Sequence, residues 1–427
     1  MIGMTYEEIV QRIEESHRFG KASGYEVSRE MLELLEHPES GMRIIHIAGT
    51  NGKGSTAVYV SSILQAAGFC VGMFTSPHLI DFTERIRVNG AQIPSEDVVR
   101  LGEKLLELPM TLEPTMFDYC LGMALLYYKE QHCDYVVLET GLGGRLDSTN
   151  GVGTLPLVSI ITRIGFDHMA YLGNTLSAIA SEKAGILKVG THAVLGVNDP
   201  EAAEVLQQTC RERRISYMDL NEETTRWVRD YVQEHRNVLM PGTYQVENAM
   251  NAVAAIRILY EMKELAPQVA TDEILDDVIL QGLEASNWPG RMQQVGNHPI
   301  FLVDGAHNPQ GVRALRESLE ERFPGEQMVF LMAVMADKDY EHMIEDVLPL
   351  ARCFYTVTVS SDRALQGSEL AERIAGRGVE AVYLDDLDLA MKQAKERARM
   401  EHCPMVAFGS LYFIGGILEK LKEDDKN

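Results

Sequence analysis

The sequence lacks the cysteine spacing of a zinc site or a disulfide framework. Its six cysteines stand at positions 70, 120, 133, 210, 353 and 403, and no two of them form a Cys-x-x-Cys motif. This pattern fits a reducing compartment, so we expect a cytoplasmic protein. Long apolar runs are also missing, since those at 44–48 and 135–138 are far too short to span a bilayer. The first 15 residues lack an apolar stretch, so we expect no secretory signal.

Basic residues are scarce. The 427 residues include 39 Lys and Arg against 63 Asp and Glu, which gives a formal net charge of −24. A surface this acidic repels nucleic-acid backbones and anionic lipid, so we expect neither a nucleic-acid partner nor a membrane partner. Any phosphate site must therefore be local, built from backbone amides and a few cations.

Apolar strand-like runs alternate with helical periodicity, which is typical of α/β folds with parallel sheets. Strands are predicted at 43–48, 70–75, 135–139, 157–164, 193–197, 300–303, 328–332, 353–359, 381–384 and 405–408. Helices are predicted at 5–16, 28–36, 55–67, 117–129, 176–184, 246–260, 310–322, 387–399 and 411–422. Pro and Gly interrupt this alternation, and we place a linker at 295–299 between domains at 1–294 and 300–427.

Residues 49–56, which read GTNGKGST, join the first of these strands to a helix. Glycines there let successive N–H groups point toward one ligand, the helix N-terminus adds positive potential, and Lys53 supplies a mobile charge. The strict P-loop pattern is not met, because Ile47 stands where its first Gly belongs and Gly54 replaces the hydroxyl residue. A glycine-rich turn that only opens a helix is the plainer alternative. The strand before and the helix after favour a nucleotide phosphate site.

Polar side chains follow several strands where those strands end. Glu139 closes the strand at 135–139, which reads DYVVLE with the residue before it. Ser76 follows the strand at 70–75, and His168 follows the strand at 157–164. Oxygen atoms of carboxylates and hydroxyls suit Mg²⁺, whereas a lone His is equally compatible with a structural role. The glycines at 141–144 predict a loop whose backbone approaches a ligand closely.

The segment 304–309, which reads DGAHNP, follows the first strand of the second domain. Asn308 and Pro309 suit the cap and first residue of a helix, which is its structural interpretation. Asp304 and His307 at a strand end are its functional interpretation.

Together these segments resemble folylpolyglutamate synthase, a family of the Mur ligase group whose bacterial members often double as dihydrofolate synthase. The resemblance rests on GTNGKGS at 49–55, TSPHL at 75–79, ETGLGGRLD at 139–147, the pair 167–168, EKAGI at 182–186, WPGR at 288–291, DGAHNP at 304–309 and the pair 409–410. These segments run in family order over nearly the whole chain. The resemblance implies a large P-loop-type ATPase domain with a mainly parallel sheet and a folate pocket, followed by a smaller Rossmann-like α/β domain for glutamate ligation.

The resemblance also implies a reaction. A folate carboxylate attacks the γ-phosphate of ATP, and the amine of L-glutamate attacks the resulting acyl phosphate to give an amide, ADP and phosphate. The implied cofactors are ATP as substrate and Mg²⁺, with a monovalent cation such as K⁺ as a further candidate. The implied partners are small molecules only, and the expected state is a monomer.

Residue roles follow from the same resemblance, position by position. The implied catalytic residues are Lys53, Lys183 and His307. The implied nucleotide contacts are Asn51, Gly52, Lys53, Gly54, Ser55, Asn248, Arg291 and Asp304. The implied metal ligands are Ser76, Glu139, His168 and Lys183, the last as a carbamate. The implied substrate contacts are Thr115, Met116, Phe117, Asp118, Leu146, Asp147 and Ser148 on the pterin side and Ser410, with His307, on the glutamate side.

Two positions depart from the family pattern. Asp118 stands where Glu is usual and Ser148 where Ala is common, and both belong to the implied pterin pocket. Whether dihydropteroate is also an acceptor therefore stays open. The alternatives are another Mur-type ligase that acts on a peptidoglycan precursor, a P-loop kinase or NTPase, and a nucleotide-sensing module without ligase activity.

Overall fold

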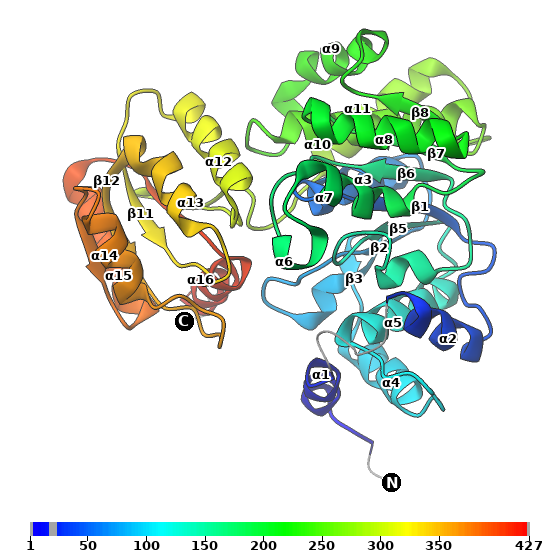
Figure 1. The fold of residues 1–427 in the computed structure, drawn as a ribbon, viewed down its shortest axis with the longest axis horizontal. Helices are drawn as coiled ribbons and strands as arrows, with labels where there is room; N and C mark the ends of the chain where they lie inside the picture. Colours follow the sequence, from blue (N-terminus) through cyan, green and yellow to red (C-terminus); the bar gives the residue numbers. More distant parts are fainter. Residues whose placement is uncertain (1–2, 17–23, 425–427) are drawn as a thin grey trace. The chain divides into compact units, whose positions relative to one another are not determined.

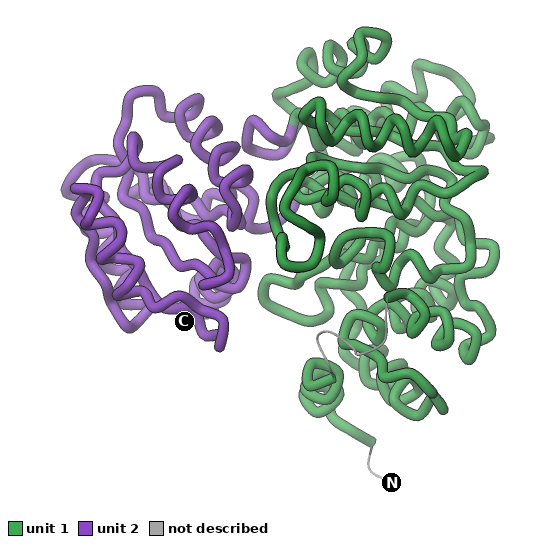
Figure 2. Tube along the Cα trace, viewed as in Figure 1, with its two compact units in different colours: residues 1–239, 246–287 green, residues 240–245, 288–427 purple. Residues whose placement is uncertain are grey.

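The computed structural model describes residues 3–16 and 24–424. The chain divides into two compact units, which are coloured separately in Figure 2. Unit 1 comprises 1–239 and 246–287, and unit 2 comprises 240–245 and 288–427. Within the described part of the chain, no helix has both the length and the apolar character needed to cross a membrane.

Unit 1 is built on a sheet with the strand order β4-β3-β2-β5-β1-β6-β7-β8 (Figure 1). Its strands are β1 (Arg43–Ala48), β2 (Val71–Phe74), β3 (Ile86–Val88), β4 (Ala91–Gln92), β5 (Tyr135–Glu139), β6 (Val158–Ile161), β7 (His192–Leu195) and β8 (Ser216–Asp219). Strands β1, β2, β5, β6, β7 and β8 run parallel, and β3 and β4 add an antiparallel edge. Every residue of β2, β5 and β6 is buried, as expected of strands covered on both faces.

Helices cover both faces of this sheet. They are α1 (Tyr6–Glu14), α2 (Glu26–Leu34), α3 (Lys53–Ala66), α4 (Ser95–Leu106), α5 (Met116–Glu130), α6 (Met169–Leu172), α7 (Leu176–Lys183), α8 (Pro200–Arg213), α9 (Arg226–Glu234), α10 (Gln245–Glu261) and α11 (Asp272–Ala285). One hydrophobic cluster joins α1, α2, α4 and α5 to β2 and β5, and another joins α7 and α8 to β6 and β7.

Unit 2 holds a second sheet with the order β13-β12-β11-β14-β10-β9. Its strands are β9 (Gln293–Asn297), β10 (Ile300–Val303), β11 (Met328–Met332), β12 (Ala351–Thr356), β13 (Ala381–Tyr383) and β14 (Met405–Phe408). Its helices are α12 (Pro309–Arg322), α13 (Tyr340–Val347), α14 (Gly367–Ala375), α15 (Leu387–Glu401) and α16 (Leu411–Asp424). All strands are parallel except β9, which pairs antiparallel with β10.

The predicted fold class, two α/β parts with mainly parallel sheets, is confirmed. The position of the boundary differs from the prediction. Residues 295–299 form the end of β9 and the turn into β10, and the units divide after Asn287 instead. Gly and Pro mark a β-hairpin turn as readily as a linker, which explains the difference. Sequence patterns also gave no sign that 240–245 belongs to unit 2.

Helix α3, which starts at Lys53, is held by close packing against α11. A Cβ atom on Gly282 of α11 would stand 2.4 Å from the Cα atom and 2.6 Å from the N atom of Ile63. Backbone atoms cannot rotate away as a side chain can, so only glycine permits this approach.

We expect Gly282→Ala to lower the free energy of unfolding of unit 1 by about 3 kcal/mol, since the two helices must separate. Urea denaturation followed by circular dichroism measures this change. Gly122→Ala is the matched control, because its Cβ would meet the flexible end of Met31 at 2.6 Å, and we expect a loss below about 1 kcal/mol. Equal losses in the two variants would contradict this account of the α3–α11 contact.

Candidate active site

The loop at 49–52 joins β1 to α3 in a conformation that requires glycine. Gly52 caps α3 with a φ of 88°, and a Cβ atom there would lie 2.1 Å from Oδ1 of Asn248. The structure therefore brings Asn248 of α10 against the loop, and its nucleotide role stays a prediction. Thr56 Oγ1 also donates to the Asn248 carbonyl oxygen at 3.5 Å.

The same loop is tied to the end of β6. The backbone N–H groups of Thr50 and Asn51 donate to the Arg163 carbonyl oxygen at 2.9 and 3.2 Å. Thr162 Oγ1 donates to the Asn51 carbonyl oxygen at 2.8 Å. These bonds hold the backbone just before the N-terminus of α3, where Lys53, Gly54 and Ser55 begin the helix. A helix N-terminus approached by a glycine loop is a favourable anion site.

Lys53 lies beside Glu139 at the carboxyl ends of neighbouring strands. Its Nζ donates to the Thr50 carbonyl oxygen at 3.2 Å and stands 3.9 Å from Glu139 Oε1. Glu139 is 4% exposed, and its Oε2 accepts the Ser76 N–H at 3.2 Å. The structure thus brings together Lys53, Glu139 and Ser76, which come from three separate segments of the sequence.

The oxygen atoms of Glu139 and Ser76 suit a hard cation that keeps some of its waters. His168 caps the short helix α6 with a φ of 50°, and its Nε2 lies 3.9 Å from Asp167 Oδ1. Within residues 3–16 and 24–424, no group of three or more His, Cys, Asp or Glu side chains is arranged to hold a metal. The donor set therefore fits magnesium only if water or phosphate supplies further oxygens, and the part of His168 stays a prediction.

The side chain of Lys183, at the end of α7, is buried. It is 4% exposed, and its Nζ donates to the Gly49 carbonyl oxygen at 2.7 Å. Burial lowers the pKa of Lys183 to about 7, and the nearby positive charge of Lys53 acts in the same direction. The carboxylates of Asp167 and Asp147 oppose this shift. This shift favours the neutral amine, whose lone pair can act as a nucleophile.

The glycine loop after β5 packs directly on the end of α7. The Arg145 N–H donates to the Glu182 carbonyl oxygen at 2.7 Å, and the two side chains form an ion pair at 2.9 Å. A Cβ atom on Gly144 would lie 2.9 Å from the carbonyl oxygens of Glu182 and Lys183. The close backbone approach seen for this loop is therefore to a helix, and the predicted approach to a ligand stays a prediction.

The first segment of the predicted pterin pocket packs against the loop after β5. Thr115 caps α5, and its N–H and hydroxyl donate to Asp118 Oδ2 at 2.9 and 2.7 Å. Met116 and Phe117 begin the helix, and the Phe117 ring would stand 2.9 Å from a Cβ atom on Gly141. The other oxygen of Asp118, Oδ1, is buried without a hydrogen-bond partner.

Asp147, from the second segment, is buried within a chain of hydrogen bonds. It accepts the Leu142 N–H at 2.8 Å and the Thr149 hydroxyl at 2.5 Å, and that hydroxyl lies 2.8 Å from Nε2 of the buried His46. Because the hydroxyl gives its one proton to Asp147, His46 donates through Nε2. Burial lowers the pKa of His46 to about 3, which favours the neutral ring.

The neighbours of Asp147 differ from it in exposure. Leu146 is 43% exposed, and the Ser148 carbonyl oxygen accepts the Ser28 hydroxyl at 2.8 Å. The supporting pair His46 and Thr149 was missed from the sequence. The available signal was a histidine between the apolar pairs 44–45 and 47–48 of the first strand.

In unit 2, Asp304 lies at the end of β10 and accepts three hydrogen bonds. Its Oδ2 accepts the Tyr244 hydroxyl at 2.7 Å and the Met292 N–H at 2.8 Å, and its Oδ1 accepts the Ala306 N–H at 2.8 Å. About four acceptor positions exist on a carboxylate, so Oδ1 retains room for one further donor. Tyr244 was not predicted to contact Asp304, because the two stand 60 positions apart.

The other predicted residues of unit 2 gather around the same strand end. Arg291 Nη1 donates to the Gly290 carbonyl oxygen at 3.0 Å and would lie 2.3 Å from a Cβ atom on Gly305. His307 Nδ1 lies 2.8 Å from the Gly305 carbonyl oxygen. Ser410, 3% exposed, follows β14, the strand next to β10. The predicted cap is confirmed, since Asn308 accepts the Gly311 N–H with Pro309 as the first helical residue.

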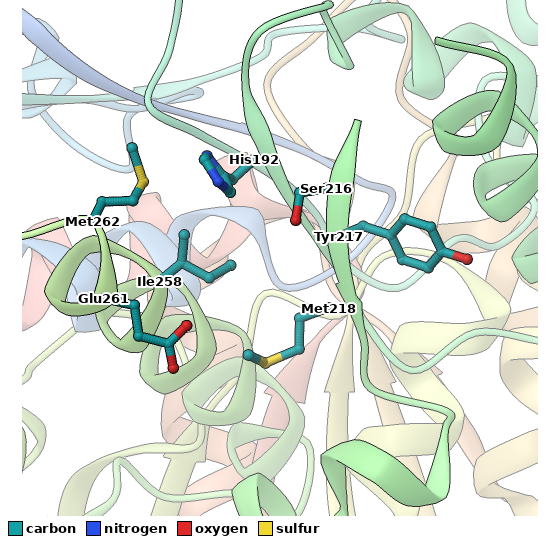
Figure 3. A pocket seen from close by; sticks show the side chains of 7 residues that line it. All are labelled: His192, Ser216, Tyr217, Met218, Ile258, Glu261 and Met262. Atoms are coloured by element: carbon teal, nitrogen blue, oxygen red, sulfur yellow. The ribbon is translucent and has the colours of Figure 1, made fainter. Parts of the chain in front are cut away.

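A cavity of about 300 Å³ lies elsewhere in unit 1 (Figure 3). It is lined by His192, Ser216, Tyr217, Met218, Ile258, Glu261 and Met262. His192 and Ser216 are the first residues of β7 and β8, so the cavity lies at the amino ends of these strands. Figure 3 shows the Tyr217 ring pointing away from the other six side chains. This cavity contains none of the predicted site residues.

Comparisons with known proteins agree with the residue patterns. The model of the Mur ligase middle domain matches residues 47–256, and that of the Mur ligase, glutamate ligase domain matches 290–409. The dihydrofolate synthase/folylpolyglutamate synthase of Bacillus subtilis is 34% identical, over 95% of this chain and 96% of its own.

Solved structures of such enzymes share the fold. Escherichia coli FolC in complex with DHPP and ADP has a TM-score of 0.84 and 25% identity, covering 99% of each chain. The Yersinia pestis bifunctional folylpolyglutamate synthase/dihydrofolate synthase with Mn, AMPPNP and L-glutamate bound has a TM-score of 0.80 and 26% identity, covering 98% of each chain. The chain therefore belongs to the folylpolyglutamate/dihydrofolate synthase family of Mur ligases.

Proposed function

We propose that this protein is an ATP-dependent ligase that joins L-glutamate to the carboxylate of a folate. The observation that carries the proposal is that Lys53, Glu139 and Lys183 lie at one edge of a parallel sheet, in a chain of this family. Lys53 lies beside Glu139, and Lys183 donates to Gly49 in the loop that leads to Lys53. The relatives favour a folate over a peptidoglycan precursor, and a ligase over a simple NTPase or a nucleotide sensor. Mn, AMPPNP and L-glutamate bind to the Yersinia pestis enzyme, and we extend ATP, a divalent cation and glutamate to this chain.

The phosphates of ATP would lie on the loop and the first turn of α3. We assign phosphate contacts to Asn51, Gly52, Lys53, Gly54 and Ser55, because backbone N–H groups at a helix N-terminus and a lysine charge favour an anion there. Asn248, beside Gly52, is assigned to the nucleotide as well. Arg291 and Asp304 are assigned to the nucleotide in unit 2, where the remaining acceptor position of Asp304 Oδ1 suits a ribose hydroxyl.

Magnesium would be held by Ser76 and Glu139, with His168 as a further ligand, and would supply neutralisation of phosphate charge. The protein itself must bring an anionic carboxylate against an anionic triphosphate, which repel each other. Lys53 supplies a positive charge at this point. It stabilises the charge that develops as a carboxylate oxygen bonds to the γ-phosphorus and ADP leaves.

The acyl phosphate formed in this step is then attacked by the amine of glutamate. The amine nitrogen bonds to the carbonyl carbon, phosphate leaves with one former carboxylate oxygen and the proton lost from the nitrogen, and an amide remains. We assign His307 and Ser410 to the glutamate side of this step. Water must be kept away, because it would hydrolyse the acyl phosphate.

The pterin group would lie between α5 and the loop after β5. Phe117 offers an aromatic face beside Gly141, and the buried Asp118 Oδ1 offers an acceptor to the N–H groups of a pterin. Thr115, Met116, Leu146, Asp147 and Ser148 complete this assignment. These residues are assigned to the pterin group, which dihydropteroate and folate share. We therefore infer that dihydropteroate is accepted as well as folate. The monomeric state, the cytoplasmic location and a bound monovalent cation stay predictions.

We further propose that Lys183 is carbamylated. The neutral amine attacks CO₂, a proton leaves the nitrogen, and an anionic carbamate results. An ammonium group has no lone pair and repels magnesium, whereas carbamate oxygens are ligands of the kind it prefers. The lowered pKa of Lys183, about 7, supports this reaction because it supplies the neutral amine.

The acceptor assignment is tested by ADP release with dihydropteroate and then with tetrahydrofolate, each with and without glutamate. We expect release with either acceptor only when glutamate is present. ADP release that ignores both acceptor and glutamate would instead indicate an NTPase. Glutamate-dependent release with tetrahydrofolate but not with dihydropteroate would overturn only the inference that dihydropteroate is an acceptor.

Lys53→Ala is expected to lower the rate of ADP release by at least about 100-fold, because a preorganised charge on the phosphates is lost. Steady-state kinetics measures the change, and circular dichroism checks the fold. Lys129→Ala, on the exposed end of α5, is the matched control and should keep the wild-type rate. A Lys53→Ala rate within a factor of about two of wild type would contradict the assignment of Lys53 to the phosphates of ATP.

Carbamylation predicts a dependence on both CO₂ and pH. Since only the neutral amine reacts, occupancy should rise as the pH increases through about 7, the pKa of Lys183. The ¹³C signal of the carbamate, measured with ¹³C-bicarbonate, checks this, and Lys183→Ala should lack both the signal and the activity.

Lys188→Ala is the control for this experiment, because Lys188 donates to the Asn150 carbonyl oxygen rather than to Gly49. It should retain the signal. An active wild-type enzyme with bicarbonate present and no carbamate signal would refute the modification.

A further inference from the structure

Two cysteines that are far apart in the sequence meet in unit 1. Cys70 directly precedes β2 and Cys133 lies two residues before β5, and their Sγ atoms are 3.8 Å apart. Both side chains are half-buried, so small molecules can reach them. The other cysteines of the chain are Cys120, Cys210, Cys353 and Cys403. Among the described residues, a sulfur–sulfur contact is found between Cys70 and Cys133.

The backbone holds these two residues in register. Strands β2 and β5 are parallel neighbours, with Val71 opposite Tyr135. The Cys70 carbonyl oxygen accepts the N–H groups of Asp134 and Tyr135 at 2.7 and 3.2 Å. The Asp134 carboxylate in turn accepts the Cys70 N–H at 2.8 Å. The two sulfur atoms therefore stay close, and side-chain rotation must shorten their separation to about 2.05 Å to form a bond.

We propose that Cys70 and Cys133 form a reversible disulfide by exchange with low-molecular-weight disulfides. Two thiols of the protein and one small disulfide become one protein disulfide and two small thiols, so atoms and electrons balance. A Cys70 thiolate first attacks the small disulfide, which forms a mixed disulfide and releases one small thiolate. Cys133 then attacks the Cys70 sulfur and releases the second, and the two protein thiol protons end on the released thiols.

The surroundings favour Cys70 as the first nucleophile. Its Sγ lies 3.8 Å from Nδ2 of Asn89, which can donate a hydrogen bond to a thiolate. Burial and the neighbouring Cys70 raise the pKa of the Cys133 thiol, so Cys133 stays protonated until the mixed disulfide has formed. Asp134 lies beside both residues and adds a negative charge that raises the pKa of Cys133 further.

The site is separate from the proposed active site. Cys70 and Cys133 stand at the amino ends of β2 and β5, whereas Ser76 and Glu139 stand at the carboxyl ends of the same two strands. These ends are roughly 15 Å apart at about 3.3 Å per residue. The disulfide would thus cross-link two central strands and close the chain between positions 70 and 133, which restricts the unfolded state.

The test uses the full chain with oxidised glutathione as the small disulfide, followed by alkylation and peptide mapping without reductant. We expect a Cys70–Cys133 cross-linked peptide, a fall from six titratable thiols to four, and full recovery after dithiothreitol. Oxidation should also raise the Tm by at least about 3 °C. Cys133→Ser should stop at a glutathione adduct on Cys70 and show no such rise.

Cys353 and Cys403 provide the matched control within the same molecule. Burial raises the pKa of Cys353 to about 11, and the nearby Cys403 acts in the same direction. Among the described residues, no hydrogen bond joins the sulfur atoms of Cys353 and Cys403, in contrast to Cys70 and Cys133. The Cys403→Ser variant should therefore oxidise as wild type does. A glutathione adduct that persists on wild-type Cys70, an equal yield of a Cys353–Cys403 cross-link, or an unchanged Tm would each overturn the proposal.

Discussion

The buried hydrogen bond from Lys183 Nζ to the Gly49 carbonyl oxygen, at 2.7 Å, connects the parts on which the active site of unit 1 depends. It joins the end of α7 to the first residue after β1, and the glycine loop with Arg145 packs on the same end of α7. Gly49 then leads into Gly52 and Lys53, so the phosphate loop, the loop after β5 and α7 form one arrangement. A shift of Lys183 would disturb all three segments. The hydrogen bond to Gly49 offsets part of the cost of burying the amine.

Charge is distributed in an unusual way for an enzyme that handles a triphosphate and a carboxylate. The chain as a whole carries a formal charge of −24, which repels both substrates. In the site of unit 1, positive charge is supplied by the N-terminus of α3, by Lys53 and by Lys183 when it is protonated. The N-terminus of α3 follows the carboxyl end of β1, and Lys183 donates to Gly49 at that same strand end, where the surrounding apolar sheet strengthens electrostatic interactions. A general basic surface is therefore unnecessary, and specificity for small anions follows from the narrow location of the positive groups.

The sequence predicts those parts of the site that local patterns determine. Strands at 43–48 and 135–139 have the bounds observed for β1 and β5, because continuous apolar runs ending at Gly49 and Glu139 leave little choice. Contacts made by tertiary packing were beyond such patterns. His46 contacts the Thr149 hydroxyl that donates to Asp147, and the Tyr244 hydroxyl donates to Asp304. Both contacts join residues that are far apart in the sequence, so they depend on the tertiary fold. The contact of Cys70 with Cys133 has the same origin, although cysteine spacing alone suggested no pairing. Asn248 was placed by resemblance, and the structure supplies its physical neighbour, Gly52.

The central claim is that the site activates a folate carboxylate by transferring phosphate to it. Turnover with a folate whose reacting carboxylate carries ¹⁸O at both oxygens, followed by mass spectrometry of the released phosphate, tests this claim most directly. One labelled oxygen should appear in each phosphate, because the carboxylate oxygen that attacks the γ-phosphorus leaves with it when glutamate forms the amide. Phosphate without label, released together with a normal yield of glutamylated product, would contradict the acyl-phosphate route and the role given to this strand edge.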